Sequence, residues 1–199
     1  VEAARKSTSW TKQTSHARAQ VLFFMAENLS DQQSIYVDLL KTVMSESDAR
    51  AEVEKAIERV FLYAAWADKL DGRVHRPPVH GLVTALHEPL GVIGVVCPDE
   101  SPLVALVSLC CSAIALGNRV VVVPSTVLPT IATPFYKTIE ASDVPGGVIN
   151  LITGDPMNLG ATLASHADVD AVWFHQMDRR GCAEIEKLSA PTLKRTWVD

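Results

Sequence analysis

The chain has 199 residues, of which 48% are hydrophobic, and a formal net charge of -5. This length allows a sizeable core, and the acidic balance, without a basic stripe between aromatic residues, argues against nucleic-acid binding. The longest apolar run, Leu103 to Leu116, is shorter than the roughly twenty residues that cross a bilayer. We therefore expect no membrane span and interpret this run as a buried helix.

Residues 1–72 are predicted to be helical. Apolar residues recur there at helical spacing, in runs separated by Ser, Asp and Asn residues that are typical of helix caps. Phe61, Tyr63 and Trp66 lie close together near the end of this segment. We interpret them as core packing rather than as a ligand site.

Residues 73–89 are predicted to form a ribbon of two short strands. A Pro-Pro pair and Gly81 mark its bend, and because Pro-Pro cannot take part in a central strand, the ribbon should lie at an edge or off the main sheet. His75, His80 and His87 lie on it. We interpret them as exposed side chains and expect no metal, since a zinc site needs convergent ligands, usually four.

Residues 90–199 alternate between strands and helices. Asp155 followed by Pro156 is typical of a helix start within this region. The predicted strands are Val92–Cys97, Val120–Val123, Val148–Ile152, Val169–Phe174 and Leu193–Val198. Continuous apolar strands separated by helices predict an α/β fold of the Rossmann type, with a doubly wound parallel sheet of about five strands.

The cysteines, Cys97, Cys110, Cys111 and Cys182, form no Cys-x-x-Cys motif. A nucleophilic cysteine needs a nearby base and an electropositive surrounding, and the sequence supplies neither. We interpret the cysteines as small core residues of a reduced protein. Together with the absence of an apolar signal segment at residues 1–6, this predicts a cytoplasmic location.

Short motifs along the whole chain follow the order of one enzyme family. They are Ser15-His16-Ala17-Arg18-Ala19, Ala65-Trp66-Ala67-Asp68-Lys69-Leu70-Asp71-Gly72, Glu88-Pro89-Leu90-Gly91-Val92, Val144-Pro145-Gly146-Gly147-Val148-Ile149-Asn150, and Ala164-Ser165-His166-Ala167-Asp168-Val169-Asp170. The chain resembles the front part of an aldehyde dehydrogenase. It is most similar to the degenerate second dehydrogenase domain of family-16 aldehyde dehydrogenases. The resemblance implies N-terminal helices (1–72), an oligomerisation ribbon (73–89) and a cofactor-binding fold (90–199), with the catalytic domain absent.

The oxyanion position of this family is altered. The family usually has Cys-Pro-Trp-Asn-Phe-Pro after the first strand of the cofactor fold, and the Asn amide helps to hold the oxyanion. Here Pro98 is followed by Asp99, Glu100 and Ser101, so that Glu100 stands in place of the Asn. An ionised carboxylate repels an oxyanion instead of donating to it.

The positions that contact the adenosine ribose are altered as well. The family usually has Lys-Pro-Ser-Glu after the second strand, where this chain has Val123, Pro124, Ser125 and Thr126. A buried valine offers no donor to a ribose hydroxyl, and threonine lacks the reach and charge of the glutamate.

The pyrophosphate and nicotinamide positions depart in the same way. Gln176 and Met177 stand where the family has the Gly and Ser that admit a pyrophosphate, and Asp178 is interpreted as a helix N-cap. Asp199 stands roughly where the family has a Glu near the nicotinamide. The resemblance thus implies a vestigial cleft formed by Pro98, Val123, Ser125, Thr126, Gln176 and Met177.

These departures imply a non-catalytic module with a structural, oligomerising or partner-docking role, without a cofactor. Its expected partners are a companion aldehyde dehydrogenase domain or a second copy bound through residues 73–89. The alternative is the cofactor-binding part of a functional NAD-dependent dehydrogenase that oxidises aldehydes to carboxylic acids. A third hypothesis, an unrelated ligand in the vacated cleft, stays open, because clefts at the carboxyl ends of strands favour binding.

Overall fold

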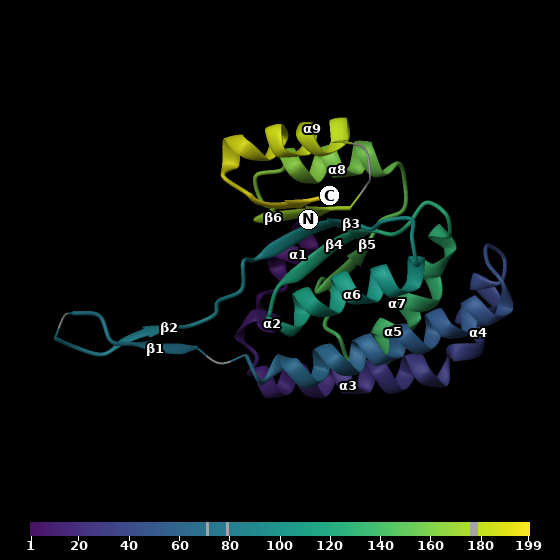
Figure 1. Cartoon of the computed structure of the whole chain (residues 1–199), viewed down its shortest axis with the longest axis horizontal. Helices are drawn as coiled ribbons and strands as arrows, with labels where there is room; N and C mark the ends of the chain where they lie inside the picture. The colour runs from purple at the N-terminus through teal and green to yellow at the C-terminus, as the bar shows by residue number, and fades with distance from the viewer. Residues whose placement is uncertain (71, 79, 176–178) are drawn as a thin grey trace.

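The strands form two separate sheets in the computed structural model, which describes residues 1–70, 72–78, 80–175 and 179–199 (Figure 1). The larger sheet has five parallel strands in the order β5-β4-β3-β6-β7, which confirms the predicted doubly wound fold. Its strands are β3 (Val92–Val96), β4 (Arg119–Val123), β5 (Ile149–Leu151), β6 (Ala171–Phe174) and β7 (Arg195–Val198). The smaller sheet pairs β1 (Arg73–His75) with β2 (Val83–Ala85) in antiparallel orientation.

Helices precede the ribbon and alternate with the parallel strands. Those before the ribbon are α1 (Glu2–Lys6), α2 (Thr8–Lys12), α3 (Ser15–Asp31), α4 (Gln33–Leu40) and α5 (Glu46–Ala67). Those between the parallel strands are α6 (Pro102–Ala115), η1 (Pro129–Ile131), α7 (Ala132–Ala141), α8 (Pro156–Ser165), α9 (Arg179–Ser189) and η2 (Ala190–Thr192). Within the described residues, none of these helices combines the length and hydrophobicity that a bilayer span requires.

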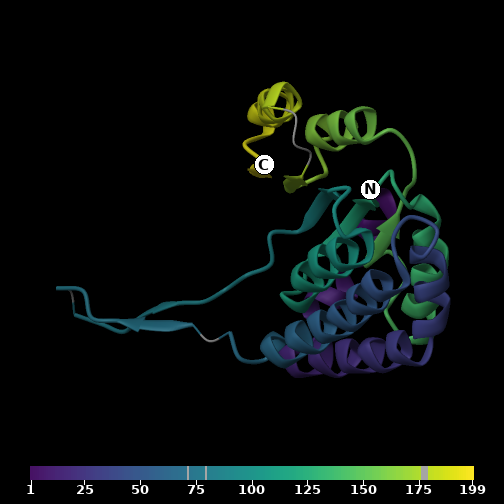
Figure 2. The same cartoon turned by 45° about the vertical axis from the view of Figure 1, so that its right-hand side comes forward.

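The parallel sheet is covered on both faces, as Figures 1 and 2 show. Helices α3, α5, α6 and α7 pack on one side, and α1, α8 and α9 on the other. Every residue of β3 and β4 is buried for this reason. Alternation along β3 divides its side chains, so that Ile93 and Val95 join the first core while Val92 and Val96 join the second.

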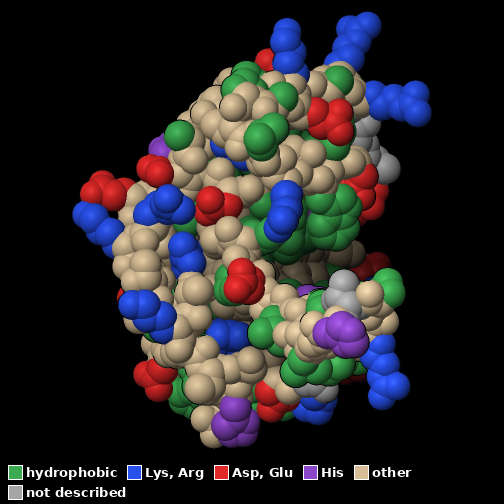
Figure 3. Space-filling view, turned by 90° about the vertical axis from the view of Figure 1, so that its left-hand side faces the viewer, with side chains coloured by type: hydrophobic (Ala, Val, Ile, Leu, Met, Phe, Trp, Pro, Cys, Tyr) green, Lys and Arg blue, Asp and Glu red, His purple; other side chains and the backbone are tan. Residues whose placement is uncertain are grey.

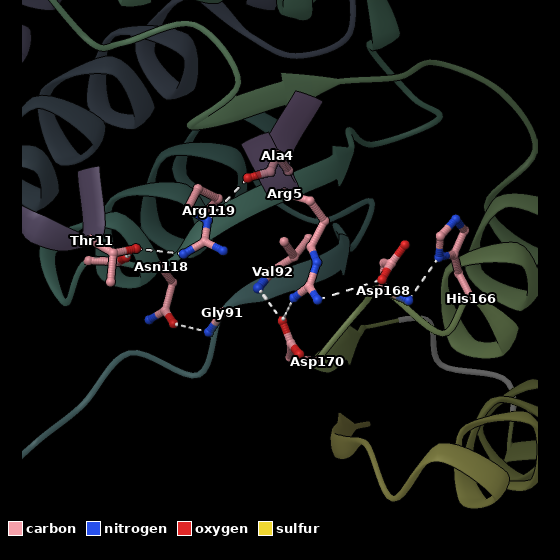
Figure 4. A network of polar contacts seen from close by, with 11 residues as sticks. Ala4, Arg5, Thr11, Gly91, Val92, Asn118, Arg119, His166, Asp168 and Asp170 are labelled. Atoms are coloured by element: carbon pink, nitrogen blue, oxygen red, sulfur yellow. Dashed lines mark hydrogen bonds and ion pairs between the residues drawn. The ribbon is translucent and has the colours of Figure 1, made fainter. Parts of the chain in front are cut away.

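Asp170 connects the N-terminal helices to the amino ends of the strands (Figure 4). Its carboxylate accepts a hydrogen bond of 2.7 Å from the Val92 backbone N–H and lies 3.4 Å from the Arg5 guanidinium. Arg5 also lies 3.6 Å from Asp168. One carboxylate therefore joins α1 to the starts of β3 and β6.

Arg119 makes a second connection at the start of β4. Its guanidinium donates one hydrogen bond of 3.2 Å to the Ala4 carbonyl and another of 2.5 Å to the Thr11 hydroxyl (Figure 4). Next to it, the Asn118 side chain accepts 3.1 Å from the Gly91 backbone N–H. These bonds fix α1 and α2 at the amino ends of the strands, the edge of the sheet opposite to the carboxyl edge where parallel sheets normally bind ligands.

Two of the three aromatic residues predicted to be core lie at the surface. Phe61 is 37% exposed and Trp66 is 51% exposed, so the core interpretation is wrong for both, whereas Tyr63 packs partly buried against the core. The opposite face of α5 packs against α3 and α6, which leaves these two side chains outside. The Phe61 ring contacts the Phe23 ring of α3, at 6.1 Å between centroids.

The ribbon extends away from the rest of the molecule (Figures 1 and 2). All residues of β1 and β2 are exposed, and so are His75, His80 and His87, as predicted. In the described part of the chain, no group of His, Cys, Asp and Glu is placed to hold a metal ion. Because the side chains of β1 and β2 are exposed, the ribbon is available for contacts outside this chain.

Replacing Gly91 by alanine should lower the free energy of unfolding by about 2 kcal/mol. Gly91 has φ +129°, and an added Cβ would lie 2.0 Å from the Asp170 carboxylate that binds Val92. Urea unfolding would measure the loss. The matched control is Gly146→Ala, where an added Cβ meets no atom within 4 Å; equal effects of the two substitutions would contradict this account.

Candidate functional site

The carboxyl ends of β3, β6 and β7 and the side of α6 border an open cavity of about 650 Å³. Parallel sheets bind ligands at this edge. The lining residues include Pro98, Asp99, Glu100, His175, Trp197 and Asp199. Figure 3 looks from the opposite side, where the ribbon leads into β3: there the surface is hollowed between the ribbon and the part of the molecule that carries α8 and α9, and hydrophobic side chains gather at the upper rim of this hollow.

The predicted site residues separate into three places. Pro98, Glu100 and Asp199 line the cavity just described. Ser125 and Thr126 line a second cavity of about 520 Å³, beside the ends of β4 and β5. Val123 lines neither cavity, because it is buried in the core and only 1% exposed. Gln176, Met177 and Asp178 lie outside the described residues.

Asp99 ties the loop after β3 to the loop after β4. Its carboxylate accepts three hydrogen bonds: one of 2.8 Å from the Ser125 hydroxyl, one of 2.7 Å from the Thr126 backbone N–H and one of 2.9 Å from the Thr126 hydroxyl. Burial opposes ionisation, but these hydrogen bonds outweigh it and hold the pKa of Asp99 below its ordinary value. The polar groups of Ser125 and Thr126 are therefore engaged by a carboxylate of the protein itself.

His175 and Asp199 form a pair that the sequence did not reveal. The His175 Nδ1 hydrogen-bonds the Asp199 carboxylate, and the imidazole ring meets the Trp197 ring edge-on at 4.5 Å between centroids. Trp197 in turn meets Trp173 edge-on at 5.6 Å, since the two residues are register partners on β7 and β6. The only sequence signal was a histidine directly after a buried strand.

Glu52 caps the helix that follows the cavity loop. Although Glu52 lies on α5, its carboxylate accepts hydrogen bonds from two backbone N–H groups in the first turn of α6. They are 2.7 Å from the Leu103 N–H and 3.3 Å from the Val104 N–H. The residue before this turn, Ser101, has φ +50° and makes no side-chain cap. Burial of Glu52 raises the pKa of its carboxyl, and the two backbone hydrogen bonds oppose this increase without cancelling it.

Three cysteines are buried side chains, as predicted. Cys97, Cys110 and Cys111 are at most 1% exposed, and burial raises the pKa of all three thiols, that of Cys111 to about 12. Cys182 is partly buried on α9 and packs against the second core. No cysteine is among the described residues that line the cavity, so this site has no thiol nucleophile of its own.

The unfolding free energy should decrease as the pH rises through the raised pKa of Glu52. A carboxyl whose pKa is higher in the folded state stabilises the fold fully below its unfolded value, about 4.3, and loses this contribution as it ionises. Glu52→Gln keeps an acceptor for Leu103 and should flatten the decrease. Urea unfolding at pH 4 to 7 tests this, with exposed Glu54→Gln as control; parallel curves for Glu52→Gln and the unmodified chain would refute it.

Comparison with known proteins places the chain in one family over its entire length. The profile described as the aldehyde dehydrogenase family matches residues 1–199. Aldehyde dehydrogenase 1A1 of Homo sapiens is 30% identical over 212 residues, which cover 100% of this chain and 41% of that protein. An aldehyde dehydrogenase of Agaricus bisporus is 30% identical over 207 residues, covering 100% of this chain and 41% of that protein.

Solved structures agree with this assignment. The NAD-dependent aldehyde dehydrogenase of Sinorhizobium meliloti superposes with a TM-score of 0.92 at 25% identity, over 100% of this chain and 40% of that one. A putative aldehyde dehydrogenase of Burkholderia cenocepacia gives 0.93 at 26% identity, over 99% and 41%. The chain thus spans about 40% of the length of the relatives that it matches. It belongs to the aldehyde dehydrogenase family.

Proposed function

We propose that this chain is a non-catalytic aldehyde-dehydrogenase-like module, with a structural, oligomerising or partner-docking role in a longer polypeptide of the cytoplasm. Its counterpart in the family would be the degenerate second domain of family-16 aldehyde dehydrogenases. The module would work without a cofactor. Its partners would be a companion dehydrogenase domain or a second copy of the chain.

The observation that carries this proposal is the engagement of Asp99 with Ser125 and Thr126. In the family pattern, the loop after β4 supplies the groups that bind the adenosine ribose. Here the polar groups of that loop hold a carboxylate instead, and Val123 at the end of β4 offers no donor. A cofactor that bound its ribose through these groups would have to break their hydrogen bonds to Asp99.

The cavity residues support the same conclusion for the chemical step. Glu100 stands at the position of the oxyanion amide, and loss of one such donor typically costs about 10²–10³ in rate. No cysteine lines the cavity among the described residues, so attack on an aldehyde would need a thiol from elsewhere.

The alternative function is the cofactor-binding part of a working NAD-dependent aldehyde dehydrogenase. The match of this whole chain to 40% of such a structure favours it, with a TM-score of 0.92. The two functions differ in dinucleotide affinity, which can be measured on this chain directly.

Titration with NAD⁺ and NADH should produce no heat signal and no shift of the melting temperature at millimolar concentration. A dinucleotide at a hundred times its Kd would stabilise the fold by about 2.7 kcal/mol, which a melting curve resolves easily. The matched positive control is a catalytically active relative under the same conditions. Micromolar binding to this chain would overturn the proposal in favour of the alternative. In a separate assay of NADH formation from aldehyde and NAD⁺, Glu100→Asn should not create aldehyde oxidation, because it restores an oxyanion donor without supplying a nucleophile.

The ribbon is the proposed contact for self-association. Because side chains alternate along a strand, Val74, its partner Thr84, and Leu82 and Leu86 on either side of Thr84 share one face. Val74, Leu82 and Leu86 are 70%, 77% and 76% exposed. An apolar face of this kind on a short two-stranded ribbon favours pairing with another chain.

The double substitution Leu82→Asp and Leu86→Asp should convert oligomers of the chain into monomers. Two carboxylates in an apolar contact would have to be buried without partners, which is strongly unfavourable. Light scattering after size-exclusion chromatography measures the mass. Leu193→Asp, at a side chain that is 90% exposed outside the ribbon, is the control. A chain that is monomeric before any substitution would disprove self-association through this face.

A further inference from the structure

We infer that the ribbon of one copy of this chain lies on the outer face of α3 and α5 of a second copy. This inference rests on the proposed self-association through the ribbon, and it names the surface that receives the ribbon. We call this surface the α3–α5 seam. It consists of exposed side chains on α3 and on or directly after α5, namely His16, Gln20, Phe23, Glu27, Glu54, Glu58, Phe61 and Asp68.

Two contacts show how α3 and α5 lie against each other along the seam. His16 Nδ1 lies 3.4 Å from the Asp68 carboxylate, and the rings of Phe23 and Phe61 meet at 6.1 Å between centroids. A step of seven positions forward on α3 thus corresponds to a step of seven positions back on α5. The two helices are therefore antiparallel, and the aromatic pair lies between the ends of the seam.

The seam is acidic next to its aromatic pair. One turn beyond Phe23, the same alignment brings Glu27 to the part of α5 that carries Glu54 and Glu58. All three glutamates are exposed, and within the described part of the chain none of them has an ion pair. Phe23 and Phe61 are themselves 39% and 37% exposed. The seam therefore suits a partner that combines apolar side chains with positive charge.

The ribbon combines these two properties. Its apolar face consists of Val74, Leu82 and Leu86, which are all at least 70% exposed. Arg73 and Arg76 are exposed beside Val74, and neither guanidinium has an ion pair among the described residues. From residue 72 to residue 88 the sequence contains a single carboxylate, that of Glu88. The ribbon and the seam are thus opposite in charge, and both expose apolar side chains.

Reach and charge favour the seam of a second copy over other contacts of the ribbon. The ribbon extends away from its own α3 and α5 in Figures 1 and 2, so it does not cover the seam of its own chain. Two ribbons placed face to face would bring the arginines of both copies together, which is unfavourable.

The lengths of the two surfaces also match. Helix α3 has 17 residues and is about 26 Å long at ~1.5 Å per residue. The part of the ribbon from Gly81 to Glu88 spans up to about 26 Å at ~3.3 Å per residue. In a two-fold symmetric pair, each ribbon would lie along the seam of the other copy.

Reversing the charge on either surface tests this contact. Glu27→Lys with Glu58→Lys makes the seam basic, and Arg73→Glu with Arg76→Glu makes the ribbon acidic. Each doubly substituted chain should self-associate with a Kd at least ~10-fold higher, because like charges then face each other. An equimolar mixture of the two chains should associate again as a heterodimer, because each ribbon then meets a seam of opposite charge. Sedimentation velocity measures the Kd, and native mass spectrometry identifies the heterodimer.

The matched control is Glu140→Lys with Glu186→Lys, since both glutamates are exposed and lie on α7 and α9, outside the seam. It should leave the Kd unchanged. An unchanged Kd after charge reversal of the seam, an equal loss in the control, or a mixture without heterodimer would each overturn the inference.

The same experiments separate this inference from the proposed function on which it rests. If reversal of the seam has no effect while Leu82→Asp with Leu86→Asp still produces monomers, the receiving surface is wrong and the role of the ribbon stands. A chain that is monomeric before any substitution contradicts both.

Discussion

The bonds from Ser125 and Thr126 to Asp99 determine the form of the carboxyl edge of the sheet. They hold the loops after β3 and β4 together, using three donors on one carboxylate. Because this contact spans neighbouring strands, it separates the two cavities and leaves the larger one between β3 and the β6–β7 side. The loop after β3 is also fixed where it enters α6, because the Glu52 carboxylate binds the Leu103 backbone N–H in the first turn of that helix. The cleft is thus shaped by contacts within the protein.

Under the proposed function, the chain retains the groups that build the fold and has replaced those that the family uses for chemistry. Asp170, Arg119 and Gly91 join the helices to the sheet at the amino ends of the strands, far from the altered positions. Packing residues and ligand-binding residues lie at opposite edges of a parallel sheet. Substitution at one edge therefore leaves the other intact, which explains a TM-score of 0.92 at only 25% identity.

Sequence patterns predicted β3, β4, β5 and β6 well, because each is a short, mostly apolar run next to Gly, Pro or Asp. The last strand begins at Arg195, two residues later than predicted, because Leu193 has a left-handed backbone (φ +53°) at the end of η2. The start of α8 was equally clear, since Asp155 accepts a hydrogen bond from the Asn158 N–H at 2.8 Å. Phe61 and Trp66 were misplaced, because helical spacing identifies a helix but not which of its faces finds a partner. The pairing of His175 with Asp199 and the cap by Glu52 join residues 24 and 51 positions apart. Only the assembled tertiary structure brings such groups together.

The buried thiols have a practical consequence. Cys97 directly follows β3, while Cys110 and Cys111 lie on α6, so three buried thiols mark the middle of one hydrophobic core. A thiol reagent can reach them only when that core opens. The rate of their labelling in native buffer would therefore report the opening of the β3–α6 unit residue by residue. The three core thiols would thus measure fluctuations of the core, and the labelling rate of the partly buried Cys182 on α9 would serve for comparison.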